Sequence, residues 1–98
     1  MIRLIAEYRI KPRTEARVLT AVKTFVAAVH RDEPQTEYRA YRLTDTNEFL
    51  HIMAFPDESA QNVHQQASYT RDLVEVLYPN CEEPPKFTLI ESVEQSDA

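Results

Sequence analysis

His64 is the side chain best suited by type and position to move a proton. It follows Ala60 by four residues and precedes Ala67 by three, a spacing that puts all three on one face of a helix. We therefore expect the imidazole to point from that helix toward a sheet. Imidazole has an ordinary pKa of about 6.5, so it can accept a proton from an acidic phenol or quinol near neutral pH. The other possibility is a half-buried structural histidine.

His51 is the one polar residue in the run from 49 to 55. Alternation along a strand places it on the side of Phe49, Met53 and Phe55, which we expect to bind substrate if that side lines a pocket. His51 would then orient the substrate by a hydrogen bond; otherwise it would face a dimer interface. We favour hydrogen-bonded packing for His51, because buried polar side chains usually find partners inside the protein.

Tyrosines extend this set of candidates. Tyr69 and Tyr8 can donate phenolic hydrogen bonds to a substrate oxygen, and Tyr38 or Tyr41 can stack on an aromatic ring. Most tyrosines simply pack in a core, so we expect only some of these four to face a ligand.

The spacing of the histidines and of the single cysteine gives little reason to expect a metal site or a reactive thiol. The three histidines, His30, His51 and His64, fall on different predicted elements, and no His-x-x-x-His or Cys-x-x-Cys spacing occurs. We therefore expect no metal site and no bound cofactor. Cys81 lies in a polar loop and is expected to be an incidental thiol.

The composition excludes several function classes. With no glycine in 98 residues, the chain cannot build the glycine-rich phosphate loops of nucleotide-binding folds. Its formal net charge of -5 argues against a nucleic-acid partner, which needs a basic face. The acidic pairs Asp32-Glu33 and Glu82-Glu83 are expected to be solvated surface. No stretch approaches the roughly 20 apolar residues of a membrane span, so we expect no membrane partner and a cytoplasmic protein.

Strands and helices must position these side chains. Thr14 can cap a helix that stops at Glu33-Pro34. Asp57 can cap a second helix over 57–69, followed by an amphipathic segment that ends at Pro79. Period-two and β-branched or aromatic patterns predict strands over 2–10, 36–43, 48–55 and 86–93.

This order of elements is that of the ferredoxin-like α+β fold, four antiparallel strands with two helices on one face. Asp45 to Asn47 supply the middle turn, because Asp and Asn tolerate the left-handed conformation. The strand over 48–55 is apolar on both sides, so the face without helices should be an apolar patch. We predict a homodimer packed through that face. One domain is expected over 1–93, with an acidic, disordered tail over 94–98.

Two groups of residues share their order and spacing with a known family. They are Glu33-Pro34 with the following strand to Tyr41-Arg42, and Asp57 to Ala60 with His64 and the stop Leu77-Tyr78-Pro79. Together they resemble the antibiotic biosynthesis monooxygenase family of dimeric α+β barrels over nearly the whole chain. The resemblance implies a pocket between sheet and helices and, in some members, oxygenation without metal, flavin or haem.

Residues and resemblance together favour a cofactor-independent monooxygenase acting on a small aromatic or quinol-type molecule. His64 would remove a proton, with Tyr69 and His51 orienting the substrate. The alternative is a non-catalytic small-ligand-binding or accessory dimer, favoured by Met53 and Phe55, which stand where many family members carry Glu and Trp. Haem degradation and isomerase activity rank below both. The expected substrate-binding residues are Tyr8, Tyr38, Phe49, Met53 and Phe55.

Overall fold

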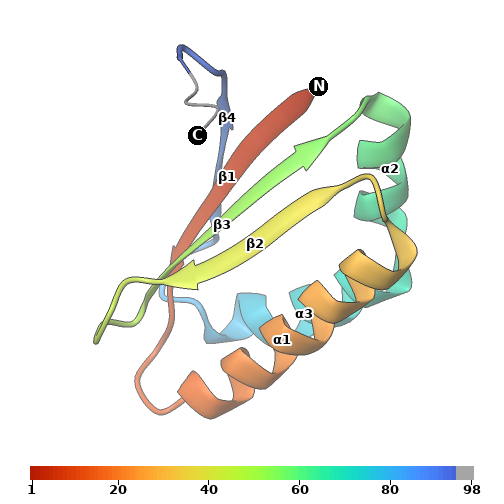
Figure 1. Ribbon diagram of the computed structural model, residues 1–98. Helices are drawn as coiled ribbons and strands as arrows, with labels where there is room; N and C mark the ends of the chain where they lie inside the picture. Colours follow the sequence, from red (N-terminus) through yellow and green to blue (C-terminus); the bar gives the residue numbers. More distant parts are fainter. Residues whose placement is uncertain (95–98) are drawn as a thin grey trace.

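The computed structural model describes residues 1–94, which form a sheet covered on one face by helices (Figure 1). The strands are all antiparallel and lie in the order β2-β3-β1-β4. This arrangement confirms the predicted ferredoxin-like α+β fold. The elements are β1 (Ile2–Arg9), α1 (Glu15–Asp32), β2 (Glu37–Arg42), β3 (Glu48–Phe55), α2 (Glu58–Gln66), α3 (Ser68–Leu77), a short 3-10 helix η1 (Tyr78–Asn80) and β4 (Lys86–Ile90).

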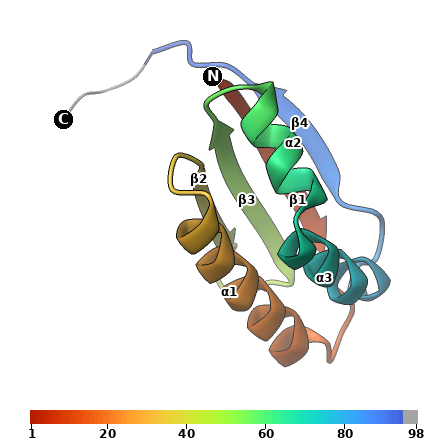
Figure 2. The same ribbon diagram turned by 90° about the vertical axis from the view of Figure 1, so that its right-hand side faces the viewer.

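The predicted second helix ends earlier than expected, and the amphipathic segment predicted after it is the separate helix α3. The prediction of one helix over 57–69 is wrong, because Ala67 takes an extended conformation (φ -65°, ψ 147°) between α2 and α3. The hydroxyl of Thr70 donates to the backbone carbonyl of His64 at 2.6 Å and so satisfies a carbonyl at the end of α2. The break sets the direction of α3 independently of α2 (Figure 2).

Strand β4 is shorter than predicted. It ends at Ile90 rather than at residue 93, because Ile90 pairs with Arg3 near the start of β1 and later residues have no partner strand beside them. Of the acidic tail predicted over 94–98, only Glu94 belongs to the described residues, where it is exposed; 95–98 lie outside them.

Local sequence signals explain most element ends. The Asp57 carboxylate accepts a hydrogen bond from the Ala60 backbone N–H at 2.9 Å, as a helix cap should. Thr14 occupies the cap position of α1, but its hydroxyl donates to the Lys11 carbonyl instead. Asp45 has φ 61° in the turn between β2 and β3, which confirms the expected left-handed residue there.

The core lies between the sheet and the helices. The side chains of Phe49, His51, Met53 and Phe55 on β3 are all buried there, and Figure 2 shows the helices lying over this face of the sheet. This arrangement excludes the possibility that His51 faces a dimer interface across the bare sheet. Residues on the other face of β3 are in part exposed, with Ile52 at 39%.

Cys81 is buried rather than part of a polar surface loop. It forms an isolated antiparallel bridge with Ile10, and burial raises the pKa of its thiol. The raised pKa keeps the sulfur protonated. The incidental role of the thiol stays a prediction, whereas the expected polar surroundings were wrong.

Candidate functional site

His64 lies on the inner face of α2, as the spacing predicted. Only 7% of the residue is exposed. Aromatic rings enclose the imidazole: Phe55 with ring centroids 5.0 Å apart, and Phe25 and Tyr38 each at 5.5 Å. Tyr38 stacks nearly parallel to it, at 26°. The imidazole is therefore a packed group whose chemistry depends on its hydrogen-bond partners.

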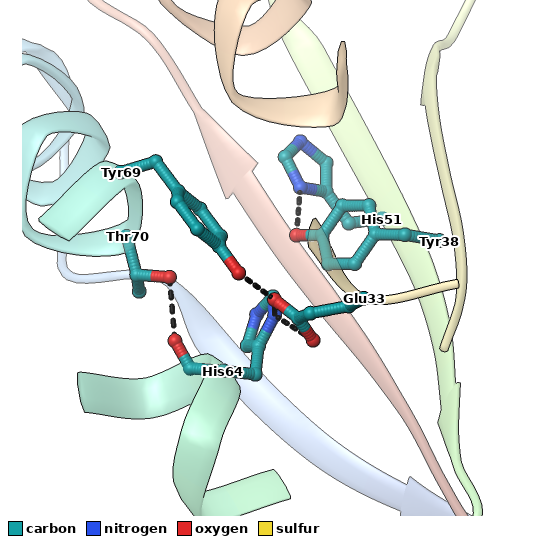
Figure 3. Close-up of polar contacts among 6 residues, drawn as sticks. All are labelled: Glu33, Tyr38, His51, His64, Tyr69 and Thr70. Atoms are coloured by element: carbon teal, nitrogen blue, oxygen red, sulfur yellow. Dashed lines mark hydrogen bonds and ion pairs between the residues drawn. The ribbon is translucent and has the colours of Figure 1, made fainter. Parts of the chain in front are cut away.

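Glu33 is the partner that the sequence analysis missed. Its carboxylate oxygens Oε2 and Oε1 lie 3.0 and 3.2 Å from His64 Nδ1 (Figure 3). Only 6% of Glu33 is exposed, so the prediction of a solvated acidic pair is wrong for this residue. It holds for Asp32, which is exposed and paired with Arg31.

A signal for Glu33 was present in the sequence. Glu33 is the C-cap residue of α1, and a negative charge at a helix C-terminus is disfavoured by the helix dipole. A carboxylate in that position therefore needs a compensating partner, which His64 supplies from α2. The Glu33-Pro34 motif marked the residue, but no spacing rule connects it to a histidine 31 positions later.

Tyr69 completes a three-residue cluster. Its hydroxyl donates to Glu33 Oε2 at 2.5 Å, so that one carboxylate oxygen serves both Tyr69 and His64 (Figure 3). Burial and the bond to Glu33 raise the pKa of Tyr69 above its ordinary value. Tyr69 therefore remains a neutral phenol and a hydrogen-bond donor at neutral pH.

A groove with a volume of about 600 Å³ runs between α1 and α3. It is mostly apolar, and Tyr69 and Phe25 form part of its wall. The imidazole of His64 is not among the lining groups, but it lies within ring contact of Phe25. Tyr69 thus connects the groove to the buried pair. The lining residues are Ala16, Arg17, Thr20, Ala21, Thr24, Phe25, Tyr69, Asp72, Leu73 and Val76.

His51 belongs to a second, separate hydrogen-bonded cluster. Its Nε2 lies 2.7 Å from the Tyr8 hydroxyl and its Nδ1 lies 2.7 Å from the Tyr38 hydroxyl. Burial lowers the pKa of His51 to about 4, so the imidazole is neutral at pH 7. A neutral ring has one donor and one acceptor nitrogen, hence one tyrosine donates to it and the other accepts from it.

The remaining predicted binding residues lie around these two clusters. Phe49 stacks on Tyr8, with ring centroids 5.2 Å apart, and Met53 and Phe55 are buried on the same face of β3. Burial raises the pKa of Tyr8 and Tyr38. All of these side chains lie beneath the helices, and none of them lines the groove between α1 and α3.

His30 stands apart from both clusters. It lies on the exposed side of α1, and its Nε2 is 3.1 Å from the backbone carbonyl of Tyr38. Within residues 1–94, no three or more His, Cys, Asp or Glu side chains gather in a way that could hold a metal ion. The same residues contain no helix that is both long enough and apolar enough to cross a membrane.

Comparison with known proteins decides the family. The sequence profile of the antibiotic biosynthesis monooxygenase family matches residues 1–76. The chain belongs to this family. The matched region includes Glu33, His64 and Tyr69.

Solved structures show that the fold is shared across the antibiotic biosynthesis monooxygenase family. One crystal structure of such a monooxygenase is 24% identical and covers 96% of this chain and 100% of its own, with a TM-score of 0.85. A candidate member from Caulobacter crescentus is 19% identical, with a TM-score of 0.85; the match covers 95% of this chain and 90% of the Caulobacter chain. Another candidate member, from Nitrosomonas europaea, is 14% identical, with a TM-score of 0.86; the match covers 96% of this chain and 100% of the Nitrosomonas chain. No curated protein matches the chain.

Proposed function

We propose that this family member is a cofactor-independent monooxygenase acting on a small phenolic or quinol-type molecule. The observation that carries the proposal is the buried Glu33–His64 pair, which Tyr69 links to the groove between α1 and α3. Membership of a monooxygenase family supports it at the level of reaction type. The apolar lining of the groove suits a flat aromatic ligand.

The proposed chemistry begins with deprotonation. His64 takes a proton from a substrate hydroxyl, and the positive charge that develops on the imidazole is stabilised by the Glu33 carboxylate 3.0 Å away. The Tyr69 hydroxyl donates its hydrogen to Glu33, so its oxygen is left to orient the substrate by accepting a hydrogen bond from a substrate hydroxyl. His51 holds Tyr38 through the bond between Nδ1 and the phenol, and Tyr38 in turn stacks on His64.

The deprotonated substrate then reacts with dioxygen. A ring carbon of the phenolate bonds to one oxygen atom to give a hydroperoxide. Loss of water, made from the outer oxygen, the proton on that carbon and the proton first removed, leaves a quinone carbonyl. The substrate supplies all four electrons that reduce dioxygen, so no external reductant enters the balance. The protein contributes deprotonation, orientation and a dry environment. Of the expected substrate-binding residues outside the groove, Phe55 packs against the His64 ring, and Tyr8, Phe49 and Met53 lie in the core of the sheet.

Oxygen uptake with a panel of quinols tests the proposal. We expect uptake above the protein-free autoxidation rate for the wild type and a loss on the order of 10²- to 10⁴-fold in His64→Ala. His64→Asn is the stricter variant, because its amide N–H can still donate to Glu33 but has no basic nitrogen. His30→Ala removes an exposed histidine and should leave the rate unchanged. Equal rates in wild type and both His64 variants would remove His64 from the mechanism.

A non-catalytic ligand-binding dimer is the second candidate. The observation that favours it is the enclosure of His64 by Phe25, Tyr38 and Phe55 outside the lining of the groove. On this reading the groove binds apolar aromatic molecules without turnover. Ligand binding with no product from any quinol would support this candidate, whereas product formation that depends on His64 would eliminate it.

We also propose that two copies associate through the bare face of the sheet. Ile52 and Ile90 lie on that face with 39% and 38% of their surface exposed, and a second copy packed on the face would bury both side chains. Light scattering should give twice the chain mass for the wild type and a monomer for Ile52→Glu. A stable wild-type monomer at micromolar concentration would refute the dimer. The buried free thiol of Cys81 suits the proposed cytoplasmic location.

A further inference from the structure

We infer that Glu33 is a positioning residue that holds His64 as the Nδ1–H tautomer and so leaves Nε2 as the basic nitrogen. The catalytic consequence rests on the proposed function. The tautomer itself follows from the geometry of the buried cluster and can be measured without any substrate.

The donor and acceptor inventory of the cluster fixes the tautomer. Both oxygens of Glu33 lie within 3.2 Å of Nδ1, and an ionised carboxylate can only accept hydrogen bonds. A hydrogen on Nδ1 is then required, because a bare nitrogen would set a lone pair against two anionic oxygens. Neutral imidazole carries one N–H, so Nε2 must be the nitrogen without a hydrogen.

The competing arrangement is a neutral Glu33 that donates to a bare Nδ1. Tyr69 works against it, since its hydroxyl donates to Oε2, the oxygen nearer Nδ1. A carboxylate accepts at both oxygens, so Oε2 can take hydrogens from Tyr69 and from Nδ1 at the same time. Only 6% of Glu33 is exposed, so water cannot replace these donors, and the two side chains must satisfy the carboxylate themselves.

Three helices hold the cluster in place. Glu33 ends α1, His64 lies in the last turn of α2 and Tyr69 lies in the first turn of α3. The backbone of His64 is also fixed, by the bond from the Thr70 hydroxyl to its carbonyl (Figure 3). Carboxylate and imidazole therefore cannot drift apart without moving packed helices, and the Nδ1 contact is maintained.

Nuclear magnetic resonance of the protein labelled with ¹⁵N-histidine tests the inference. Long-range proton–nitrogen correlation spectra separate the two neutral tautomers, and His64→Asn identifies the His64 signals by their absence. We expect the wild type to show the Nδ1–H form for His64. The Nε2–H form in the wild type, or a ring with hydrogen on both nitrogens at neutral pH, would overturn the inference, whatever the behaviour of any variant.

Glu33→Gln tests the cause, because glutamine keeps the size of the side chain but can either accept from Nδ1 or donate to it. We expect it to lose the single tautomer and give a mixture. Asp32→Asn is the matched control, since it removes the neighbouring carboxylate, which pairs with Arg31 and not with His64. It should leave the His64 spectrum unchanged. A pure Nδ1–H form in Glu33→Gln would show that Glu33 is not the cause.

An activity measurement separates this inference from the proposed function. With a quinol substrate, Glu33→Gln should lower kcat on the order of 10²-fold with little change in KM, because part of the His64 population then lacks a basic Nε2 and the imidazolium that forms loses its carboxylate partner. If Glu33 had a merely structural role, its substitution would change both kcat and KM or neither of them. An Nδ1–H tautomer without wild-type turnover would refute the function and leave the inference standing. Turnover by a wild type that carries the Nε2–H tautomer would refute the inference and leave the proposed function standing.

Discussion

The two buried histidines have similar burial and opposite surroundings. His51 is 2% exposed and His64 is 7% exposed, and both contact the ring of Tyr38. His51 has a neutral phenol on each nitrogen. His64 has a carboxylate on one nitrogen. Burial alone therefore does not distinguish a structural histidine from a candidate base; the charge of its partner does.

The two clusters also differ in how they reach the surface. Tyr8, His51 and Tyr38 bond to one another through their polar atoms, and Tyr8 lines a separate hollow beside Phe49 rather than the groove between α1 and α3. The Glu33 cluster includes Tyr69, whose ring lines the groove between α1 and α3. A ligand in that groove would touch the second cluster and not the first. We therefore propose the proton transfer for His64 and a structural role for His51.

Low pH should produce the largest effect that distinguishes the His51 cluster, through a loss of folding stability. The pKa of His51 is about 4 in the folded protein and about 6.5 in an unfolded chain. The unfolded state therefore binds the proton first. Burial of neutral His51 gives stability that is fully present above about pH 6.5 and is lost as the pH falls toward 4, on the order of 3 kcal/mol in total.

Urea unfolding at a series of pH values measures this loss. The stability gap between wild type and His51→Phe should shrink by that amount between pH 7 and pH 4, because the variant has no imidazole to protonate. His30→Ala, which removes an exposed histidine, should follow the wild type. Parallel curves for wild type and His51→Phe would mean that His51 does not resist protonation.

Removal of one phenol should have a smaller effect. Tyr8→Phe or Tyr38→Phe leaves one nitrogen of buried His51 without a partner, which we expect to cost about 1–3 kcal/mol. The double variant should cost less than the sum, because the two bonds share one ring and polarise each other. Urea unfolding of the three variants measures the coupling. Tyr78→Phe, at a residue 40% exposed, should change stability by less than about 0.5 kcal/mol.

The comparison of the two histidine clusters would fail if the stability loss of the double variant equalled the sum of the losses in Tyr8→Phe and Tyr38→Phe. It would show that the two phenols are held independently of His51. The cluster of Tyr8, His51 and Tyr38 would then be three packed side chains rather than one hydrogen-bonded unit.

The sequence predicted the fold because its signals are local. Alternation gave the strands, the spacing of Ala60, His64 and Ala67 gave the inward face of α2, and Asp57 and Asp45 marked a cap and a turn. The same alternation placed His51 with Phe49 and Phe55. These features depend on neighbours within a few residues, where strand and helix periods apply.

The candidate site was predicted only in part, because its decisive contacts are distant in sequence. Glu33 and His64 are separated by 31 residues and Tyr69 and Glu33 by 36, and they meet only after α1, α2 and α3 pack. The break at Ala67 was missed as well, since Thr70 replaces a helical hydrogen bond without a strong sequence signal. The groove arises from the packing of α1 on α3, which periodicity does not specify.

Incorporation of labelled dioxygen tests the central claim most directly. The wild type would be supplied with ¹⁸O₂ and a quinol that it oxidises, and the product analysed by mass spectrometry immediately after quenching. We predict one ¹⁸O atom in each product molecule, with product formation largely lost in His64→Asn and preserved in His30→Ala. Product without the label, or labelled product formed equally well by His64→Asn, would contradict a monooxygenase built on the Glu33–His64 pair.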